Sequence, residues 1–251
     1  MPRARGWVTR FSAGLASVLP DHLVGSAIRA VYPRVEPELR RIAEFVPRGG
    51  TAVDLGAWYG PWTQRMTMLA DHVVAIEPAP RLADHLRTAF PGVQVVEAAA
   101  SDHDGTAALY LPESGPGVGV SSLEPGIGDS VTVRLTTLDA LDLTDVTFIK
   151  LDVEGHEMPA LRGGVTTIQR DGPTLLVELE ERIQPIQPVL DLLGQWGYVG
   201  SVLPNGDWVP LGHFDLGAHQ RATITRVDHS FLRRVVWPRP RYVNSVLFRP
   251  V

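Results

Sequence analysis

The sequence predicts an α/β fold in which a mostly parallel β-sheet carries helices on both faces. From Thr51 onwards, short apolar runs alternate with segments of helical periodicity, as expected for repeated strand–helix–strand units. Four of these runs are apolar without alternation, which is typical of parallel strands that are buried on both faces. Each of the four also carries an acidic residue at or beside its carboxyl end: TAVDL, VVAIE, TFIKLD and TLLVEL.

The first 48 residues are expected to form a helical N-terminal extension, because they are rich in turns and show no strand pattern. Between Glu36 and Val46, apolar residues recur at helical spacing, which predicts a helix there. Such an extension suits a cap or a dimerisation surface, so a homodimer is left open. Residues 49–251 are then expected to form one further domain.

The elements of that domain follow one another in order along the chain. A proline at position 159 suits the first turn of a helix, and Asn205-Gly206 is typical of a β-hairpin turn. Two β-rich segments, 106–112 and 130–138, flank a loop rich in glycine and serine at 115–126. We expect strands at 51–56, 72–78, 93–101, 147–153, 173–180, 198–204, 208–211 and 242–248, and helices at 61–70, 80–90, 159–170 and 185–196.

Composition excludes several classes of protein. A net charge of -5 argues against a nucleic-acid-binding domain, which usually carries a surplus of basic residues. The absence of cysteine excludes a disulfide scaffold, a zinc site built on thiolates and a cysteine nucleophile. The sequence contains no run of 18 apolar residues, so no membrane-spanning helix is expected. The first residues weakly resemble a secretory signal, but Arg10 interrupts their apolar stretch. We therefore expect a cytoplasmic protein.

A turn after the first strand is the candidate cofactor loop. Gly56 and Gly60 permit a tight turn and a close approach of the backbone to a ligand. Their spacing is G-x-x-x-G, and bulky Trp58 and Tyr59 stand where a dinucleotide loop has its central glycine. A cofactor without a pyrophosphate, such as S-adenosyl-L-methionine (AdoMet), therefore fits this loop better than NAD. Asp54, at the end of the strand, could attract the ammonium group of such a ligand.

Two further strand ends offer polar groups to the same ligand. Glu77 lies 21 residues beyond Gly56, at the end of the second strand, where a carboxylate can bind both ribose hydroxyls. Ser101 and Asp102 follow the third strand and could reach an adenine edge, although a helix-capping role explains them nearly as well.

The densest group of polar residues runs from Lys150 to Glu157. Lys150 is the only lysine among 23 basic residues, and the strand period places it on the same face as Asp152. A lysine in a buried strand needs an anionic partner, which Asp152, Glu154 or Glu178 could supply. His156 falls at a helix start, which favours the neutral imidazole that can act as a base. The alternative is a cluster that serves capping and packing.

Six motifs occur in order along this part of the chain. They are D-L-G-A-x-x-G at 54–60, A-I-E-P at 75–78, A-x-S-D-x-x-G at 99–105, V-S-S-L at 120–123, I-K-L-D-V-E-G-H-E-x-x-x-L-R-G at 149–163 and L-L-V-E at 175–178. With these motifs, residues 51–182 resemble the FkbM-type methyltransferases, and 242–250 carry an echo of the same family. Trp58-Tyr59 departs from the family, whose members commonly have asparagine followed by a variable residue.

The resemblance implies a Rossmann-like class I methyltransferase fold, with a seven-stranded sheet whose last strand is antiparallel, and AdoMet as methyl donor. Many members methylate sugar hydroxyls during polysaccharide, glycolipid or polyketide biosynthesis. We therefore expect an O-methyltransferase of a sugar or oligosaccharide, similar to those that act on methylmannose polysaccharides, with a mannoside as the candidate acceptor. The alternatives are a non-sugar small-molecule acceptor, or a nucleotide-binding protein without catalytic activity. A nicotinamide-dependent oxidoreductase is disfavoured, because G-x-G-x-x-G is absent.

Candidate residues follow from the motifs and the resemblance together. His156 or Asp152 would accept the proton of the acceptor hydroxyl, Lys150 would orient Asp152 or stabilise the oxyanion, and Glu178 would hold a second hydroxyl. Asp152 and Glu178 could instead bind Mg²⁺. Residues 116–126 form either a lid over the acceptor or a plain connector. The candidate acceptor-binding residues are Ser121, Ser122 and Glu154. The candidate cofactor-binding residues are Asp54, Gly56, Ala57, Tyr59, Gly60, Thr63, Glu77, Ser101, Asp102 and Asp152.

Overall fold

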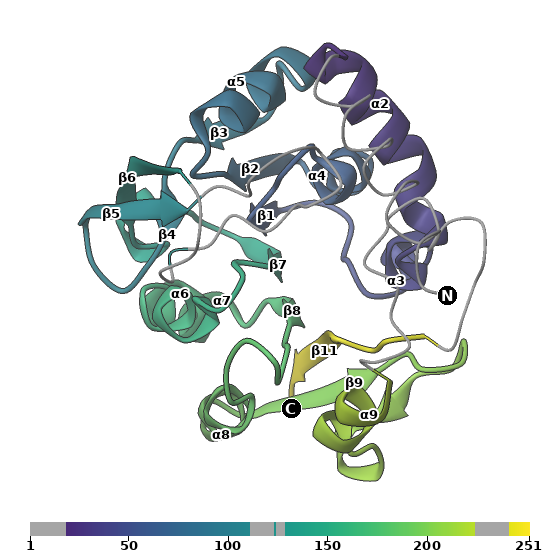
Figure 1. Cartoon of the computed structure of the whole chain (residues 1–251). Coiled ribbons are helices and arrows are strands. Elements are labelled where there is room, and N and C mark those ends of the chain that lie inside the picture. The colour runs from purple at the N-terminus through teal and green to yellow at the C-terminus, as the bar shows by residue number, and fades with distance from the viewer. Residues whose placement is uncertain (1–18, 111–122, 124–128, 224–240) are drawn as a thin grey trace.

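A large twisted sheet runs through the middle of the molecule, with helices on both of its faces (Figure 1). The structure is a computed structural model, and it describes residues 19–110, 123, 129–223 and 241–251. Within these residues, no helix has the length and apolar character needed to cross a membrane.

The main sheet has the strand order β10-β9-β11-β8-β7-β1-β2-β3. The central strands β3, β2, β1, β7 and β8 are parallel, whereas β11 lies antiparallel between β8 and β9. The predicted mostly parallel sheet with an antiparallel last strand is therefore confirmed. The described sheet has one strand more than expected, because the short β10 pairs with β9 at the edge. The strands are β1 (Thr51–Leu55), β2 (His72–Ile76), β3 (Gln94–Val96), β7 (Val146–Leu151), β8 (Thr174–Glu178), β9 (Tyr198–Val202), β10 (Val209–Pro210) and β11 (Ser245–Pro250).

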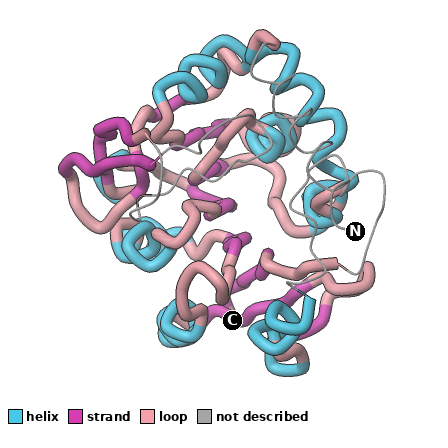
Figure 2. The backbone as a smooth tube through the Cα atoms, viewed as in Figure 1, coloured by secondary structure: helices cyan, strands magenta, loops and turns pink. Residues whose placement is uncertain are grey.

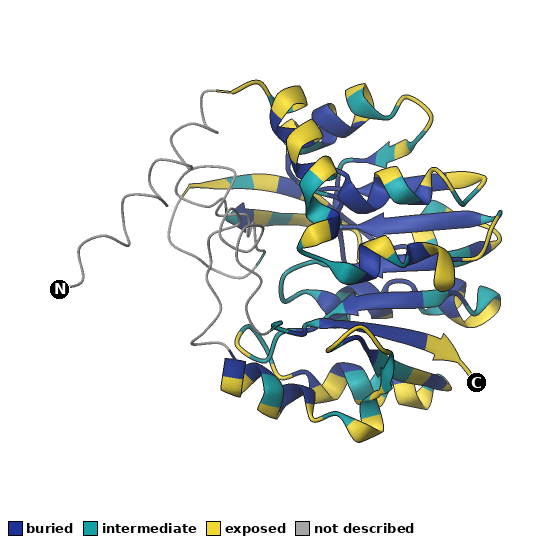
Figure 3. Ribbon diagram, turned by 90° about the vertical axis from the view of Figure 1, so that its right-hand side faces the viewer, coloured by how far each residue is buried: buried dark blue, intermediate teal, exposed yellow. Residues whose placement is uncertain are grey.

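Two hydrophobic clusters separate the two faces of this sheet. Val53, Ile149 and Val177 lie in a cluster with residues of α6 (Glu157–Arg162), α7 (Val165–Asp171) and α8 (Gln187–Gln195). Ala52, Phe148 and Leu176 lie in the other cluster, with residues of α3 (Pro37–Arg40) and α4 (Pro61–Met66). Figure 1 shows these two sets of helices on opposite sides of the strands. The strands between them are almost wholly buried, and exposed residues gather on the outer sides of the helices (Figure 3).

The remaining helices cover the ends of the sheet. They are α2 (Asp21–Val31), α5 (Pro80–Ala89) and α9 (Leu216–Thr223), with short 3-10 turns at Tyr32–Arg34, Ile42–Glu44, Asp139–Leu141 and Leu211–His213. Figure 2 shows how loops join helices and strands in alternation through most of the chain. The N-terminal extension is helical where it is described, but the helix expected at 36–46 is interrupted. It divides into α3 and a 3-10 turn because Arg41 leaves helical geometry, with ψ 12°.

A second, three-stranded sheet projects from the main one. It has the order β4-β6-β5 and consists of β4 (Ala99–Ala100), β5 (Gly105–Tyr110) and β6 (Ser130–Thr136). The single strand expected at 93–101 is therefore wrong. After Val96 the chain leaves β2 and turns, so that Ala99 and Ala100 pair with β6 instead.

The helix expected at 159–170 is also two helices. It begins earlier, at Glu157, and breaks at Gly163-Gly164 before α7. A Cβ atom on Gly163 would lie 1.9 Å from the backbone oxygen of Ser101, so only glycine allows this close approach. The break thus lets the end of α6 rest directly against the segment that follows β4.

Candidate functional site

Three neighbouring strands bring polar side chains to one face of the sheet, near the carboxyl ends of the strands. Asp54 on β1 is in register with Lys150 on β7, and Glu178 ends β8. Strand alternation places all three on the same face as Phe148 and Leu176, which is the face that α3 and α4 cover. The sheet therefore assembles Asp54, Lys150 and Glu178, which come from well-separated segments of the chain, into one polar row.

Lys150 is the centre of this row. Its side chain is 1% exposed, and its Nζ lies 3.3 Å from Asp152 Oδ2 and 3.7 Å from Glu178 Oε2. Neither contact has hydrogen-bond geometry, and Nζ has no hydrogen-bond partner among the described residues. Burial would lower the pKa of the ammonium, but the surrounding carboxylates outweigh burial and hold the pKa above its usual range. Lys150 is therefore a buried cation with donor capacity to spare.

Two of the carboxyl groups near Lys150, those of Asp54 and Glu178, have raised pKa values. Burial raises the pKa of Asp54 to about 6, against the hydrogen bond that Thr63 Oγ1 donates to Asp54 Oδ2 over 2.5 Å. Burial, and then repulsion from Asp152, raises the pKa of Glu178 well above its ordinary value. Glu178 also accepts a hydrogen bond from the side-chain amide of Asn244. This edge of the sheet therefore holds several acidic groups around one buried ammonium, and burial disfavours the ionisation of Asp54 and Glu178.

The candidate cofactor loop adopts the strained turn that its glycines predict. Gly56 and Gly60 have φ values of 82° and 75°, and Trp58 also has a positive φ of 51°. A Cβ on Gly56 would lie 1.9 Å from the backbone oxygen of Asp152, so glycine there lets β1 and the end of β7 meet. This contact sets the cofactor loop directly beside the Lys150–Asp152 pair.

Glu77 closes the other side of this loop. Its two carboxylate oxygens accept hydrogen bonds from the backbone N–H groups of Trp58, over 2.8 Å, and Ala79, over 2.9 Å. Burial raises the pKa of Glu77 to about 7, and Asp54 and Asp152 add to the rise. Since a carboxylate has about four acceptor positions, Glu77 retains capacity for the two hydroxyls of a ribose.

Tyr59 points away from the polar row, towards α2. Its hydroxyl donates a hydrogen bond to Asp21 over 3.1 Å and accepts one from Arg81 over 2.9 Å. Its backbone oxygen accepts a hydrogen bond from Arg29 over 3.0 Å. The side chain of Tyr59 therefore anchors the loop to α2, and Ala57 is buried against α5.

His156 stands at the N-cap of α6, as expected from the sequence. Its Nε2 is 3.0 Å from the hydroxyl of Ser101, which is fully buried. Asp102 turns outwards and forms a 2.6 Å contact with His103, which lowers the pKa of the Asp102 carboxyl. The structure thus joins His156 to Ser101, on the side of the second sheet.

The turn after β7 carries further strain and charge. Glu154 has φ 47° and Gly155 has φ 94°, and Glu157 accepts a hydrogen bond from the backbone N–H of Gly155 over 3.0 Å. Burial, followed by repulsion from Asp152 and Glu180, raises the pKa of Glu154 to about 9. Glu154 therefore lies within the electrostatic reach of Asp152, which also acts on Lys150.

Several residues near the row were not singled out from the sequence. Glu36 accepts hydrogen bonds from Tyr32 and from the indole of Trp62, each over 2.8 Å. Nothing in the sequence marks Glu36, because it lies in the extension and follows no strand. Asn244 did carry a signal, since it is a polar residue inside the apolar run YVNSVLF.

The loop at 116–126 and the candidate Mg²⁺ ligands have different outcomes. Of this loop, the structure describes only Leu123, so the candidate acceptor-binding residues Ser121 and Ser122 lie outside the described residues. Across the described ranges, no group of three or more histidine, aspartate or glutamate side chains is arranged to hold a metal ion. Asp152 and Glu178, considered for Mg²⁺, both face the ammonium of Lys150 instead.

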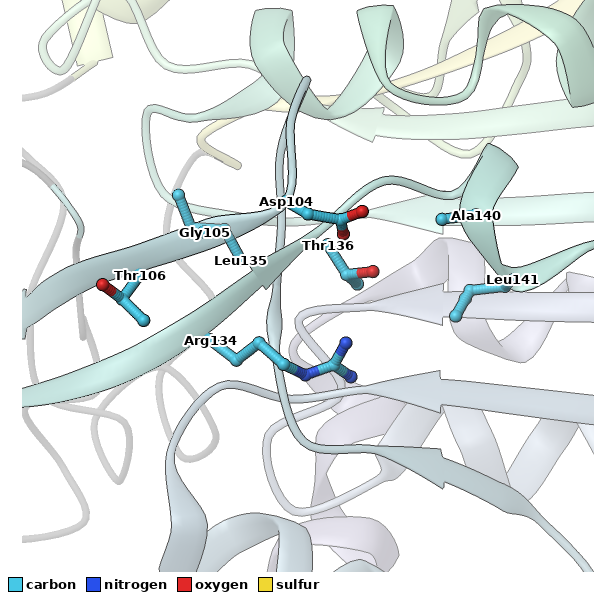
Figure 4. A pocket seen from close by; sticks show the side chains of 8 residues that line it. All are labelled: Asp104, Gly105, Thr106, Arg134, Leu135, Thr136, Ala140 and Leu141. Atoms are coloured by element: carbon cyan, nitrogen blue, oxygen red, sulfur yellow. The ribbon is translucent and has the colours of Figure 1, made fainter.

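A shallow cavity of about 610 Å³ lies elsewhere, at the second sheet (Figure 4). It is lined by Asp104, Gly105, Thr106, Arg134, Leu135, Thr136, Ala140 and Leu141. None of the candidate residues from the sequence lines it, so it is separate from the polar row.

A family model described as Methyltransferase FkbM domain matches residues 50–199. No curated protein matches the chain. Among solved structures, a methyltransferase FkbM from Methylobacillus flagellatus KT is 19% identical with a TM-score of 0.44, over 64% of this chain and 42% of that one. The present chain thus spans less than half the length of that protein.

Two other solved structures cover most of the chain. A Streptococcus mutans protein in complex with SAH is 9% identical with a TM-score of 0.46, over 87% of this chain and 98% of that one. A TehB-like SAM-dependent methyltransferase from Corynebacterium glutamicum is 13% identical with a TM-score of 0.46, over 92% of this chain and 98% of that one.

Proposed function

Because this chain belongs to the FkbM methyltransferase family, we propose that it transfers a methyl group from AdoMet to a hydroxyl oxygen of a sugar or oligosaccharide. The observation that carries the proposal is Lys150, a buried ammonium held between Asp152 and Glu178 beside the candidate cofactor loop. AdoMet supplies a methyl group that its sulfonium already activates. The protein's task is therefore to align the acceptor and to accept its proton.

The candidate cofactor residues fit AdoMet in charge and in hydrogen bonding. Asp54, Glu77 and Asp152 meet at the ends of β1, β2 and β7, and their negative charge favours a cationic sulfonium and an ammonium group. Glu77 would accept the ribose hydroxyls, and the turn from Gly56 to Gly60 would approach the ligand with its backbone. Thr63 would act through Asp54, to which its hydroxyl donates. Ser101 and Asp102 would border the adenine.

Asp152 is the proposed base. A sugar hydroxyl is a weak nucleophile until its proton is removed, and a positioned base typically contributes about 10²–10⁴-fold. Asp152 is 24% exposed, so it can meet an acceptor, while Lys150 behind it is buried. The ammonium would hold the carboxylate in place and stabilise negative charge on the acceptor oxygen as the proton moves to Asp152.

His156 is the second candidate for the base. Ser101 lies within hydrogen-bond distance of its Nε2, so His156 would have to give up that contact to accept a proton there. The two candidates differ in a direct test: Asp152→Asn removes the base in one case, and His156→Gln in the other.

The residues near Glu178 support a neutral, polyhydroxylated acceptor. Glu178, Glu154 and Asn244 offer oxygens and an amide to several hydroxyls at once. Burial, and then repulsion from Asp152, raises the pKa values of both Glu154 and Glu178. A phosphorylated or carboxylated acceptor would add to this repulsion, so a neutral sugar such as a mannoside fits better.

The experiment is product analysis after incubation of the full chain with AdoMet that carries a deuterated methyl group. A panel of neutral sugars, mannosides and non-sugar alcohols serves as acceptors, and mass spectrometry locates the label. We expect the label on a sugar oxygen, with turnover lost in Asp152→Asn and retained in Asp84→Asn. Asp84 is an exposed residue of α5 that pairs with Arg87, so it is a matched control.

Three results would contradict the proposal. Label on nitrogen or carbon would exclude O-methylation, and label on a non-sugar hydroxyl alone would exclude the sugar. AdoMet binding without any transfer would favour the binding protein considered from the sequence.

A further inference from the structure

Glu36 lies before the region that the family model matches, yet its carboxylate interacts electrostatically with Lys150. It directly precedes Pro37, and the residue before a proline is restricted to extended backbone; Glu36 has φ -112° and ψ 99°. It stands at the N-cap of α3, but its side chain makes no capping hydrogen bond to that helix. Instead it accepts hydrogen bonds from Tyr32 and Trp62, so its orientation serves another purpose than helix capping.

Trp62 connects Glu36 to Lys150. The indole Nε1 donates to Glu36 Oε2 over 2.8 Å, while Lys150 Nζ lies 5.8 Å from the ring centroid. A cation within about 6 Å of an aromatic face is attracted by the ring. The ring itself is buried and packs against Phe148, the residue two before Lys150 on β7.

Among the described residues, no hydrogen bond fixes the ammonium of Lys150. Its Nζ has no hydrogen-bond partner among the described residues, and its nearest carboxylate oxygens are 3.3 Å and 3.7 Å away. The ammonium is therefore held by charge and by the indole ring, without a directed bond to fix it. A change in the angle of that ring would move the ammonium relative to Asp152.

We propose that Glu36 is a positioning residue, which holds the indole of Trp62 and thereby places the ammonium of Lys150 against Asp152. The N-terminal segment is then part of the catalytic machinery and not only a cover. The effect on turnover rests on the proposed function of Lys150, whereas the placement of Lys150 does not. Tyr32 assists, because its hydroxyl orients the second oxygen of Glu36 and its ring contacts Trp58 in the cofactor loop.

The alternative is that Glu36 only ties the extension to α4. In that case its removal would lower stability but leave Lys150 where it is. The chain offers a direct way to separate the two, because Lys150 is its only lysine. Labelling lysine with ¹⁵N at Nζ therefore gives a single ammonium signal in NMR spectra of the whole protein.

The experiment compares this signal in Glu36→Ala, Glu36→Gln and Trp62→Phe with the wild type. Trp62→Phe keeps an aromatic ring but removes the indole N–H. We expect the Lys150 signal to shift in Glu36→Ala and in Trp62→Phe. Because Glu36 also acts on Lys150 through its charge, the double variant should shift the signal by less than the sum of the two single shifts, and additive shifts would show that Glu36 does not act through the indole. Glu36→Gln retains an acceptor oxygen, so it should give a smaller shift and stays informative if Glu36→Ala does not fold.

Glu44→Gln is the matched control, because Glu44 is an exposed glutamate of the same segment, paired with Arg41. Its spectrum should match the wild type. An unchanged Lys150 signal in folded Glu36→Gln and Trp62→Phe would overturn the proposal. No acceptor is needed, so the outcome is independent of the sugar assay.

A second readout then tests the consequence for turnover. With active sites counted by AdoMet binding, Glu36→Gln should lower kcat by about 10–100-fold, since small misplacements of reacting groups carry losses of this order. The affinity for AdoMet should stay within twofold of the wild type. If the Lys150 signal shifted while kcat stayed unchanged, Glu36 would still position Lys150, but Lys150 would have no role in the proposed reaction.

Discussion

Lys150 stabilises carboxylates that would otherwise repel one another at the end of the sheet. Asp152 and Glu178 lie within 3.7 Å of its ammonium, and Asp54 and Glu36 also raise the pKa of that ammonium. Removal of one partner of a buried ion pair leaves the other charges without compensation. Lys150 is therefore important for the fold as well as for the proposed reaction.

Replacement of Lys150 by methionine, which has a similar length and no charge, should lower the free energy of unfolding by about 3–5 kcal/mol at pH 7. The pKa of Lys150 is raised in the folded state, so its contribution is fully present below the ordinary lysine pKa and is lost only at strongly alkaline pH. The loss in Lys150→Met should be smaller at pH 4, where protonation of the carboxyl groups relieves their repulsion. Urea denaturation at both pH values measures this.

The control for this substitution is Arg87→Met, which removes an exposed cation from Asp84 and Glu97. An exposed pair contributes about 0–1 kcal/mol, so the effect should be small. Equal losses for Arg87→Met and Lys150→Met would show that the Lys150 cluster has no special stabilising role.

Glu77 gives the site a dependence on pH near neutrality. Its pKa is about 7 in the folded chain, above the ordinary glutamate value, so the fold favours its protonated form. Its ionisation therefore lowers the free energy of unfolding as pH rises from the ordinary value through 7. The same ionisation creates the carboxylate that we propose to bind the ribose of AdoMet.

We accordingly expect the affinity for AdoMet to rise between pH 6 and pH 8, measured by titration calorimetry. In Glu77→Gln the affinity should be weaker and nearly independent of pH over this interval. An unaltered pH dependence in Glu77→Gln would assign the effect to another group, of which Asp54, with a pKa of about 6, is the first candidate.

At the scale of elements, α2 is fastened to the cofactor loop through Tyr59. The ring of Tyr59 packs with Val24 and Ile28 of this helix, and its hydroxyl lies between Asp21 and Arg81. The sequence placed Tyr59 in the loop but could not reveal this contact. Its partners Asp21 and Arg81 lie on two separate helices, and no sequence motif links them to Tyr59. The loop and the extension therefore form one packed unit.

Tyr59→Phe should lower the free energy of unfolding by about 1.5–3 kcal/mol, the range for hydrogen bonds to charged groups. Amide exchange in α2 should become faster, because the helix loses the hydrogen bond between Asp21 and the loop and keeps only the one from Arg29 to the backbone oxygen of Tyr59. Tyr198→Phe is the matched control, since Tyr198 donates one hydrogen bond to the backbone oxygen of Pro173. If Tyr59→Phe and Tyr198→Phe had the same effect on the amide exchange rates of α2, the Tyr59 hydroxyl would not attach α2 to the loop.

Element boundaries also show where sequence reasoning reaches its limit. The strands that are apolar on both faces were predicted within a few residues, because burial on both sides leaves a pattern in one segment alone. The break between α6 and α7 depends on the contact of Gly163 with Ser101, two residues about 60 positions apart. The sequence pattern of a single segment does not predict such a contact.

For the whole molecule, the order of strands decides which residues meet. The sequence predicted that acids at several strand ends would share one edge, and the sheet does bring Asp54, Lys150 and Glu178 to one face. It could not predict Glu36, whose contribution arises only when the N-terminal extension packs against α4. Nor could it predict that His156 contacts Ser101, because that depends on the turn of the chain into the second sheet.

The central claim is that the candidate cofactor loop and the polar row around Lys150 form a single site. Titration of AdoMet and of S-adenosylhomocysteine into the ¹⁵N-lysine-labelled protein tests it most directly, through the one ammonium signal. We predict that both ligands shift the Lys150 signal, and that AdoMet shifts it further because its sulfonium adds positive charge nearby. Binding detected by calorimetry with no change at Lys150 would contradict the claim.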